Sequence, residues 1–145
     1  MKPSIQFHYL FDQRFYFPHR KNLKKFLLAL FKKEGYSVDT VNYIFCSDAF
    51  LLDINLEFLK HDSFTDIISF KLSDENQSII ADIYISIEQV ISNSKSLNIP
   101  FKNEFHRVMF HGVLHLCGYN DKTKEEKITI RKKEDFYLGQ YFCST

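Results

Sequence analysis

The segment from Lys102 to Cys117 limits the possible folds more than any other part of the chain. It carries apolar side chains on nearly every side of a predicted helix, and Gly118 follows at the place where a helix C-cap favours glycine. Because a helix that is apolar all round has to be covered on several sides, we expect it at the centre of the molecule. Its apolar residues are Phe105, Val108, Met109, Phe110, Val113, Leu114, Leu116 and Cys117.

The rest of the chain supplies strands and helices that can cover such a central helix. Segments with alternating or β-branched apolar residues predict four strands, and the polar turn SDENQ between the last two indicates a hairpin. These strands are 4–10, 41–47, 66–72 and 78–87. The other predicted helices are 18–33, 48–60, 88–97 and 123–138. The order βαβαββααα lacks strict alternation, so we expect an α+β fold with a mixed four-stranded sheet and about five helices.

Length and composition favour one packed domain over residues 1–145. Hydrophobic residues make up 45% of the chain, and no apolar stretch is long enough to span a bilayer. The three cysteines are an odd number without the spacing of a disulfide framework, which is typical of thiols in a reducing compartment. We therefore expect a cytoplasmic monomer without a membrane segment.

Charge alone does not identify a partner, because the formal net charge is only +1. Basic residues nevertheless gather in the helix 18–33, whose apolar positions follow an amphipathic pattern. One interpretation of these cations is a solvated helix face, and the other is a surface that binds the phosphate backbone of a nucleic acid. They are Arg20, Lys21, Lys24, Lys25, Lys32 and Lys33.

Two histidines of the central helix, His111 and His115, are four residues apart and point the same way from the helix axis. Their imidazoles can therefore share one metal ion. The helix ends at Gly118, and the turn after it can bring Asp121 back toward the pair. Three such ligands leave the fourth tetrahedral position of a zinc ion open, which is typical of a catalytic zinc site. Hydrogen bonds to backbone carbonyls are the alternative for the two imidazoles.

Two charged residues extend the histidine face toward the start of the helix. Arg107 lies one turn before His111, and Glu104 lies about two turns before it. A guanidinium at this place can bind a phosphate beside the metal and stabilise the charge that develops on a phosphodiester under attack. An ion pair between Arg107 and Glu104 is the alternative interpretation.

Gly112 distinguishes this metal helix from that of the zincin metallopeptidases, which it otherwise resembles. In their H-E-x-x-H helix a glutamate follows the first histidine and acts as the base. A glycine at that place removes the base and weakens the peptidase interpretation. Inside a helix, a glycine also indicates close packing or the approach of a ligand.

The run HGVLHLCGYND at 111–121 resembles the signature H-G-x-L-H-L-x-G-Y-D-H of the YbeY family of bacterial endoribonucleases. Upstream, NLEFLKHDSFTDIISF at 55–70 resembles the family segment that ends in T-[DN]-V-L-S-F, and ADIYIS at 81–86 resembles its G-D-I-x-I strand. The three blocks keep the family's order and spacing and cover most of residues 48–138. From these motifs the chain is identified as a member of the family.

The chain departs from the family signature at three positions. Asp121 stands in place of the third histidine, and Asn120 in place of the aspartate before it. Carboxylate oxygen binds zinc at nearly the same distance as imidazole nitrogen, so the resemblance still implies one zinc ion, or another divalent ion, per chain. Leu59 falls where many members carry an arginine, which leaves Arg107 or a lysine to contact phosphate.

The resemblance implies a single-strand-specific, metal-dependent endoribonuclease that helps to mature the 3′ end of 16S rRNA and supports ribosome quality control. Its expected partners are rRNA and the small ribosomal subunit. Arg107 and Asp82 are the candidate catalytic residues, and Asp66 is a further candidate base or partner of a metal ligand. For both aspartates, hydrogen bonding at strand ends is the alternative.

Two other functions stay open at this point. One is a zincin-like metallopeptidase, and the other is a non-catalytic ribosome assembly factor whose structural metal ties the last two helices together. A catalytic metal predicts that loss of His115 lowers activity more than stability. A structural metal predicts instead that chelation lowers the melting temperature sharply.

Overall fold

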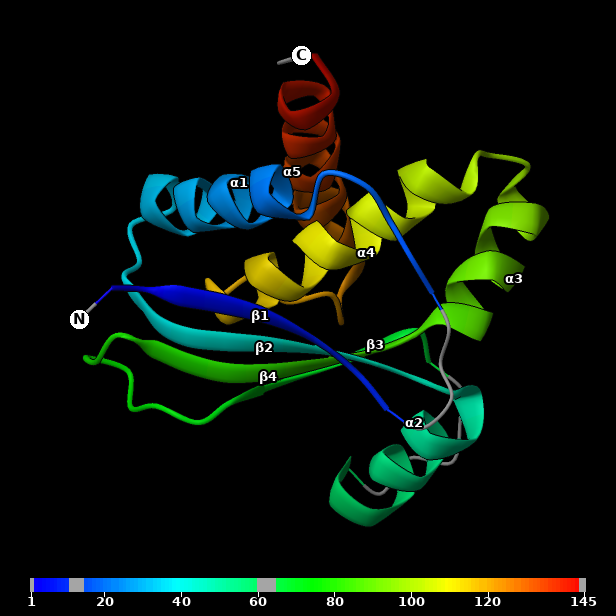
Figure 1. The fold of residues 1–145 in the computed structure, drawn as a ribbon, viewed down its shortest axis with the longest axis horizontal. Coiled ribbons are helices and arrows are strands. Elements are labelled where there is room, and N and C mark those ends of the chain that lie inside the picture. The colour runs from blue at the N-terminus through cyan, green and yellow to red at the C-terminus, as the bar shows by residue number, and fades with distance from the viewer. Residues whose placement is uncertain (1, 11–14, 60–64, 144–145) are drawn as a thin grey trace.

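A mixed four-stranded sheet organises the fold, and helices lie on both of its faces (Figure 1). The computed structural model describes residues 2–10, 15–59 and 65–143. Its strands are β1 (Ser4–Tyr9), β2 (Val38–Cys46), β3 (Ile67–Lys71) and β4 (Ile79–Ser86). They lie in the order β1-β2-β4-β3, in which β1, β2 and β4 are parallel and β3 runs antiparallel to β4.

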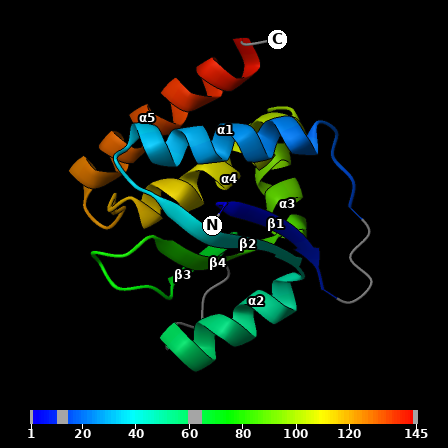
Figure 2. The same cartoon turned by 60° about the vertical axis from the view of Figure 1, so that its left-hand side comes forward.

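The helices are α1 (Arg20–Lys33), α2 (Asp48–Ile54), α3 (Ile87–Leu97), α4 (Phe101–Leu116) and α5 (Lys124–Cys143). A π-helical turn, η1 (Asn55–Leu59), continues α2. Figures 1 and 2 show α1, α4 and α5 on one face of the sheet and α2 on the other. The predicted order of elements, the mixed four-stranded sheet and the α+β class are therefore confirmed.

Local sequence signals set the ends of these helices. The Ser47 side chain accepts a hydrogen bond from the backbone N–H of Phe50 and so caps α2. At the start of α5, the hydroxyl of Thr123 accepts from the N–H of Glu126, whose carboxylate accepts from the N–H of Thr123, as the predicted capping box requires. Gly118 ends α4 with a φ of 95°, which side chains other than glycine rarely adopt.

Two elements extend beyond their predicted bounds by more than one residue. β2 begins at Val38, before its predicted start, because Val38 already pairs with β4 across an irregularity in the register. α5 continues past its predicted end at Leu138, because Tyr141 packs against Phe26 of α1 with ring centroids 5.0 Å apart. The predicted end of the second helix, at residue 60, lies outside the described residues.

The core lies between the sheet and the helices α1 and α4. Alternate residues of β2 and β4 face it and are fully buried, as the two-residue period of a strand requires. The hydroxyl of Tyr43 donates a hydrogen bond of 2.8 Å to the carbonyl of Met109 and so ties β2 to α4. Most of α4 is buried, as its apolar pattern predicts. The buried strand residues are Val41, Tyr43, Phe45, Ala81, Ile83 and Ile85.

Gly112 lies where α4 rests on the sheet. A Cβ atom there would approach side-chain atoms of Ile67 to 3.0 Å and of Ile83 to 3.1 Å. We therefore expect Gly112→Val to lower the free energy of unfolding by about 1–3 kcal/mol through overpacking. Urea denaturation measures the effect, with Gly139→Val in α5 as the control, because nothing lies near a Cβ at Gly139. Equal losses in the two variants would contradict the packing argument.

Candidate metal centre

His111, His115 and Asp121 come together at the end of α4. The two histidine rings lie on successive turns of the helix, with centroids 4.5 Å apart. Gly118 lets the chain turn back, and the Asp121 carboxylate then lies 3.4 Å from His111 Nε2 and 3.3 Å from His115 Nε2. One ligand atom of each residue lies within 4.8 Å of the other two. The structure therefore places together all three residues that the sequence predicts as metal ligands.

The donor atoms of this cluster suit one small divalent cation. Imidazole nitrogen and carboxylate oxygen bind zinc at about 2.0–2.2 Å, which sets neighbouring donors of a tetrahedral site about 3.3–3.5 Å apart. Asp121 lies at this separation from both histidines. The three side chains are 19–43% exposed, so that solvent and a substrate can reach the cluster. The site can thus hold a metal ion that a substrate contacts.

Glu134 of α5 supports the cluster, although the sequence did not single it out. Its side chain is only 5% exposed, and its carboxylate accepts a hydrogen bond of 2.6 Å from His111 Nδ1. A carboxylate at Nδ1 keeps the proton on that nitrogen and leaves Nε2 free to bind a cation. The last helix carries several acidic residues, so only the packing of α5 on α4 shows which of them meets His111.

Arg107 lies beside the cluster and is held by two carboxylates of α5. Its terminal nitrogens donate to Glu134 at 2.9 Å and to Asp135 at 2.6 Å, in place of the ion pair with Glu104 that was the alternative from sequence. A guanidinium has five N–H groups, so others are left for a ligand. The side chain of Leu59, at the family's arginine position, lies outside the described residues.

Burial and neighbouring charges move the pKa values of the two imidazoles in opposite directions. Burial lowers the pKa of His111, but the hydrogen bond and the charge of Glu134 outweigh it, so that this pKa is raised. Burial and the nearby His111 together lower the pKa of His115. A neutral His115 suits a metal site, because only an unprotonated nitrogen can coordinate.

Two hollows meet at the cluster, with volumes of about 480 and 310 Å³. Asp66, His111 and Asp121 line both of them. The Asp66 carboxylate accepts a hydrogen bond of 3.1 Å from Asn93 of α3. Burial raises the pKa of Asp66, against the opposing charge of His111. The structure thus brings one of the two candidate aspartates to the edge of the metal cluster.

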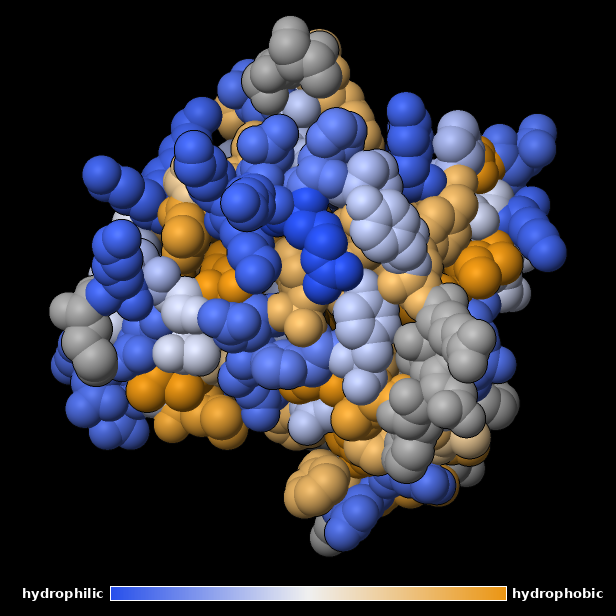
Figure 3. All heavy atoms as spheres, in the orientation of Figure 1, coloured by the Kyte–Doolittle hydropathy of each residue, from blue (hydrophilic) through white to orange (hydrophobic). Residues whose placement is uncertain are grey.

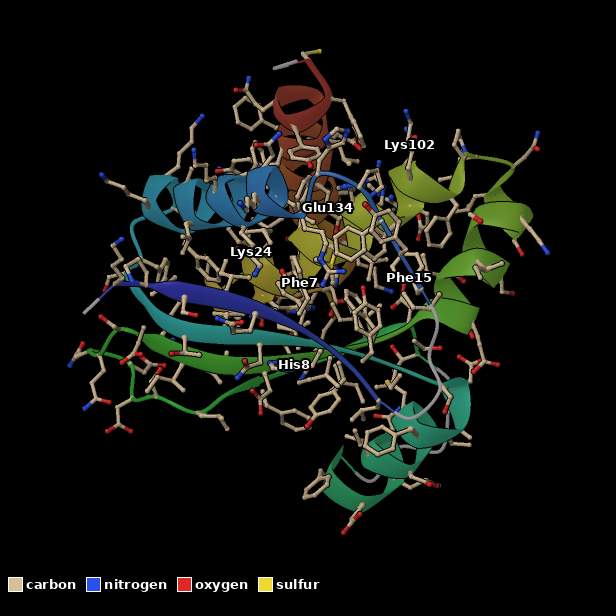
Figure 4. All side chains as sticks on the ribbon, viewed as in Figure 1. Phe7, His8, Phe15, Lys24, Lys102 and Glu134 are labelled. Carbon is tan, nitrogen blue, oxygen red and sulfur yellow. The ribbon has the colours of Figure 1, made fainter. Side chains whose placement is uncertain are left out.

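Asp82, the other candidate aspartate, lies on the opposite face of the sheet. Its neighbour Ile83 packs toward α4, and successive side chains of a strand point to opposite faces. Asp82 accepts a hydrogen bond of 3.2 Å from Asn42, whose amide oxygen lies 2.9 Å from His8 Nε2. Figure 4 shows His8 on the side of the sheet away from Glu134. The structure therefore does not bring Asp82 to the cluster.

Glu34, at the end of α1, anchors the loop that carries Asp121. It accepts hydrogen bonds from Tyr119 in that loop, at 2.8 Å, and from Tyr137 of α5, and Lys133 Nζ donates to it at 3.3 Å. Burial raises the pKa of Glu34, but these hydrogen bonds and the Lys133 charge outweigh it, so that the pKa lies below its ordinary value of 4.5. The carboxylate therefore stabilises the loop in its ionised form.

We expect Glu34→Gln to lower stability more at neutral pH than in acid. A carboxylate whose pKa is lowered by folding stabilises the folded state above its unfolded pKa, and the contribution is lost as the pH falls through the folded pKa. The difference in unfolding free energy between wild type and variant should therefore shrink from about pH 7 to about pH 3. Urea titrations measure it, and Glu75→Gln, at an exposed position in the turn between β3 and β4, should show little difference at either pH.

The fold and the cluster define a class of small α+β protein in which one buried helix presents a His-x₃-His pair and the following loop adds a carboxylate. The cluster lies at a helix end, and its side chains are partly exposed to solvent. The chain belongs to the YbeY family, because the family model described as Endoribonuclease YbeY matches residues 12–141. The family identified from the motifs is thereby confirmed.

The sequences of two relatives match this chain over most of their own length. The Endoribonuclease YbeY of Cytophaga hutchinsonii is 44% identical over 139 residues, which cover 96% of this chain and 97% of the relative. That of Flavobacterium psychrophilum is 51% identical over 104 residues, 70% of this chain and 72% of the relative. The solution structure of TM1509 from Thermotoga maritima is similar with a TM-score of 0.64 and 29% identity, and covers 96% of this chain and 89% of that one.

Proposed function

We propose that this protein is a metal-dependent endoribonuclease that cuts single-stranded RNA. The observation that carries the proposal is the convergence of His111, His115 and Asp121 in hollows that solvent reaches. The name shared by the family and its relatives, endoribonuclease, supports it. The donor atoms favour zinc, with other divalent ions as candidates. A bound ion supplies Lewis acidity beside a phosphodiester and makes water a better nucleophile.

In this proposal the chain's own residues orient the reactants. Glu134 keeps a proton on His111 Nδ1 and so turns Nε2 toward the ligand position. Arg107, fixed by its two carboxylate partners, offers its remaining N–H groups to a phosphate oxygen in the adjoining hollow. Asp66 lines both hollows and is the proposed base that takes a proton from the attacking water. Asp82 has no part in this scheme.

The biological substrate that we propose is 16S rRNA near its 3′ end, which the protein meets on the small ribosomal subunit during maturation and quality control. Membership of the family supports this role. Within the described part of the chain, no helix combines the length and apolar character that a membrane crossing demands. We propose a single domain that works as a cytoplasmic monomer with one metal ion.

The two alternative functions have less support. Gly112 stands where a zincin peptidase has its base, and a Cβ atom there would already approach Ile67 to 3.0 Å and Ile83 to 3.1 Å, so that the side chain of a base has no free space at this position. A non-catalytic assembly factor with a structural metal calls for a closed site. His115 and Asp121 instead have side chains that are 28% and 43% exposed.

Metal analysis and RNA cleavage together test the proposed function. Purified protein should contain one divalent ion per chain, and it should cut a labelled single-stranded RNA but not the same strand in a duplex. Chelation should stop the cleavage, while circular dichroism shows that the fold is kept. A metal-loaded protein that leaves RNA intact, and whose melting temperature collapses on chelation, would support the structural metal instead.

A further inference from the structure

An aromatic groove lies toward the opposite end of α4 from the metal cluster. It has a volume of about 890 Å³, and it forms where the beginnings of α1 and α4 meet the end of α5. Half of the residues that line it are phenylalanine or tyrosine. They include Tyr16 before α1, Phe101 of α4, and Tyr141 and Phe142 of α5. No role in the metal site accounts for this surface.

The aromatic groove carries positive charge. Lys25 and Lys102 line it, and among its described lining residues there is no aspartate or glutamate. Arg20, Lys21 and Lys24 continue the positive charge along α1. Figure 3 shows hydrophilic side chains gathered over this helix, and Figure 4 shows Lys102 near the beginning of α4. A polyanion is therefore the complementary ligand.

Two helices begin at the aromatic groove without a side-chain cap. Within the described residues, neither His19 before α1 nor Pro100 before α4 has a side chain that bonds the first backbone N–H groups. Such N–H groups, together with the positive end of the helix dipole, attract an anionic oxygen such as that of a phosphate. The C-terminal end of α5 also lies at the groove, and the negative end of its helix dipole weakens this attraction. The net attraction for an anion therefore comes from the lysines.

The exposed ring of Tyr16 distinguishes the groove from ordinary core packing. Tyr16 is 78% exposed, whereas Phe105, deeper in the groove, is buried in the core. Phe142 is half-buried, and Lys102 Nζ lies 5.6 Å from its ring centroid. Open aromatic rings beside lysines are the elements with which proteins stack unpaired bases and hold their phosphates.

The hollows around the metal cluster lack such an excess of positive charge. Among their described lining residues, four carboxylates match four lysine or arginine side chains. Phosphate contacts by an excess of cations supply much of the affinity of proteins for nucleic acid. The side chains of the aromatic groove offer that excess, and the side chains around the metal cluster do not.

We propose that the aromatic groove binds unpaired nucleotides of the RNA strand outside the cleavage site, with bases stacked on Tyr16 and Phe142 and phosphates held by Lys25 and Lys102. The inference rests on the proposed function, because it gives the same substrate a second binding surface. Lys102 and His111 are nine residues apart on α4, about 14 Å along its axis. At about 3.4 Å per stacked nucleotide, only strands longer than about four nucleotides touch both sites.

The test measures binding apart from cleavage. Fluorescence anisotropy follows the binding of single-stranded RNA of about four and about twelve nucleotides, with EDTA present so that no strand is cut. Tyr16→Ala should weaken binding of the longer strand about 5- to 150-fold, and Tyr16→Phe, which keeps the ring, should bind like wild type. Joint replacement by Lys25→Gln and Lys102→Gln should lower the slope of log affinity against log salt by about 1.4.

A matched variant with Lys32→Gln and Lys95→Gln removes the same charge outside the groove and should bind like wild type. In metal-loaded protein, the groove variants should change cleavage of the longer strand chiefly through KM. Groove variants that bind the longer strand like wild type overturn the inference even where RNA is cut. Wild-type protein that cuts no RNA contradicts the proposed function instead, so the two failures are distinguishable.

Discussion

Replacement of His115 by glutamine should abolish RNA cleavage and leave the fold intact. Within the described residues, His115 supplies one of three converging donor atoms, and two ligands hold a divalent ion far more weakly than three. Its side chain is 28% exposed, so the free energy of unfolding should change by less than about 1 kcal/mol. Loss of the hydrogen-bond partner of a metal ligand typically lowers activity by about 10- to 100-fold, and loss of the ligand itself has a larger effect. Cleavage should therefore fall by more than about 100-fold.

Metal content, cleavage rate and urea denaturation of the purified variant measure these effects. His8→Gln is the matched control, because His8 lies in β1 and contacts Asn42 on the opposite face of the sheet. This control should keep its metal and its activity. If His115→Gln cleaves RNA at the wild-type rate, the reacting centre lies elsewhere.

Glu134→Gln should weaken metal binding about 10- to 100-fold. The amide oxygen can still accept from Arg107, which leaves the amide N–H₂ facing His111 Nδ1. That nitrogen then has to accept a hydrogen bond, so the imidazole proton moves to Nε2, the atom that faces Asp121. A protonated Nε2 cannot coordinate. Titration of the apo protein with zinc, followed by competition with a chelator, measures the change in affinity.

Asp135→Asn separates this effect from one that acts through Arg107. Asp135 makes the other contact to the guanidinium but none to His111, and its side chain is 59% exposed. Its replacement should leave the metal affinity within about twofold of wild type. Equal losses of affinity in the two variants would mean that Arg107, and not the tautomer of His111, controls the site.

The sequence predicts the order of elements well, because most of them carry their own local signals. The Ser47 cap, the Thr123 capping box and Gly118 each act within a few residues of where they stand. The extension of α5 depends instead on Tyr141 meeting Phe26, a contact between opposite ends of the chain. Such a contact leaves no local trace in the sequence.

The residues of the metal site also differ in whether the local sequence predicts them. His111 and His115 are predictable because helical spacing alone places them side by side. Glu134 is not, because its part in the site depends on how α5 is rotated against α4. Asp82 matches a family motif, but the motif does not say which face of β4 its side chain takes.

If the cluster binds an ion, the hydrogen bond between Glu134 and His111 couples the docking of the last helix to ion binding. Linkage is reciprocal, so an ion that binds more tightly when Glu134 is in place also holds α5 more firmly against α4. Amide hydrogens of α5 should exchange more slowly with solvent when zinc is added, a protection that reports local opening and not global unfolding. An ion bound at the cluster would thereby stabilise the docking of the C-terminal helix.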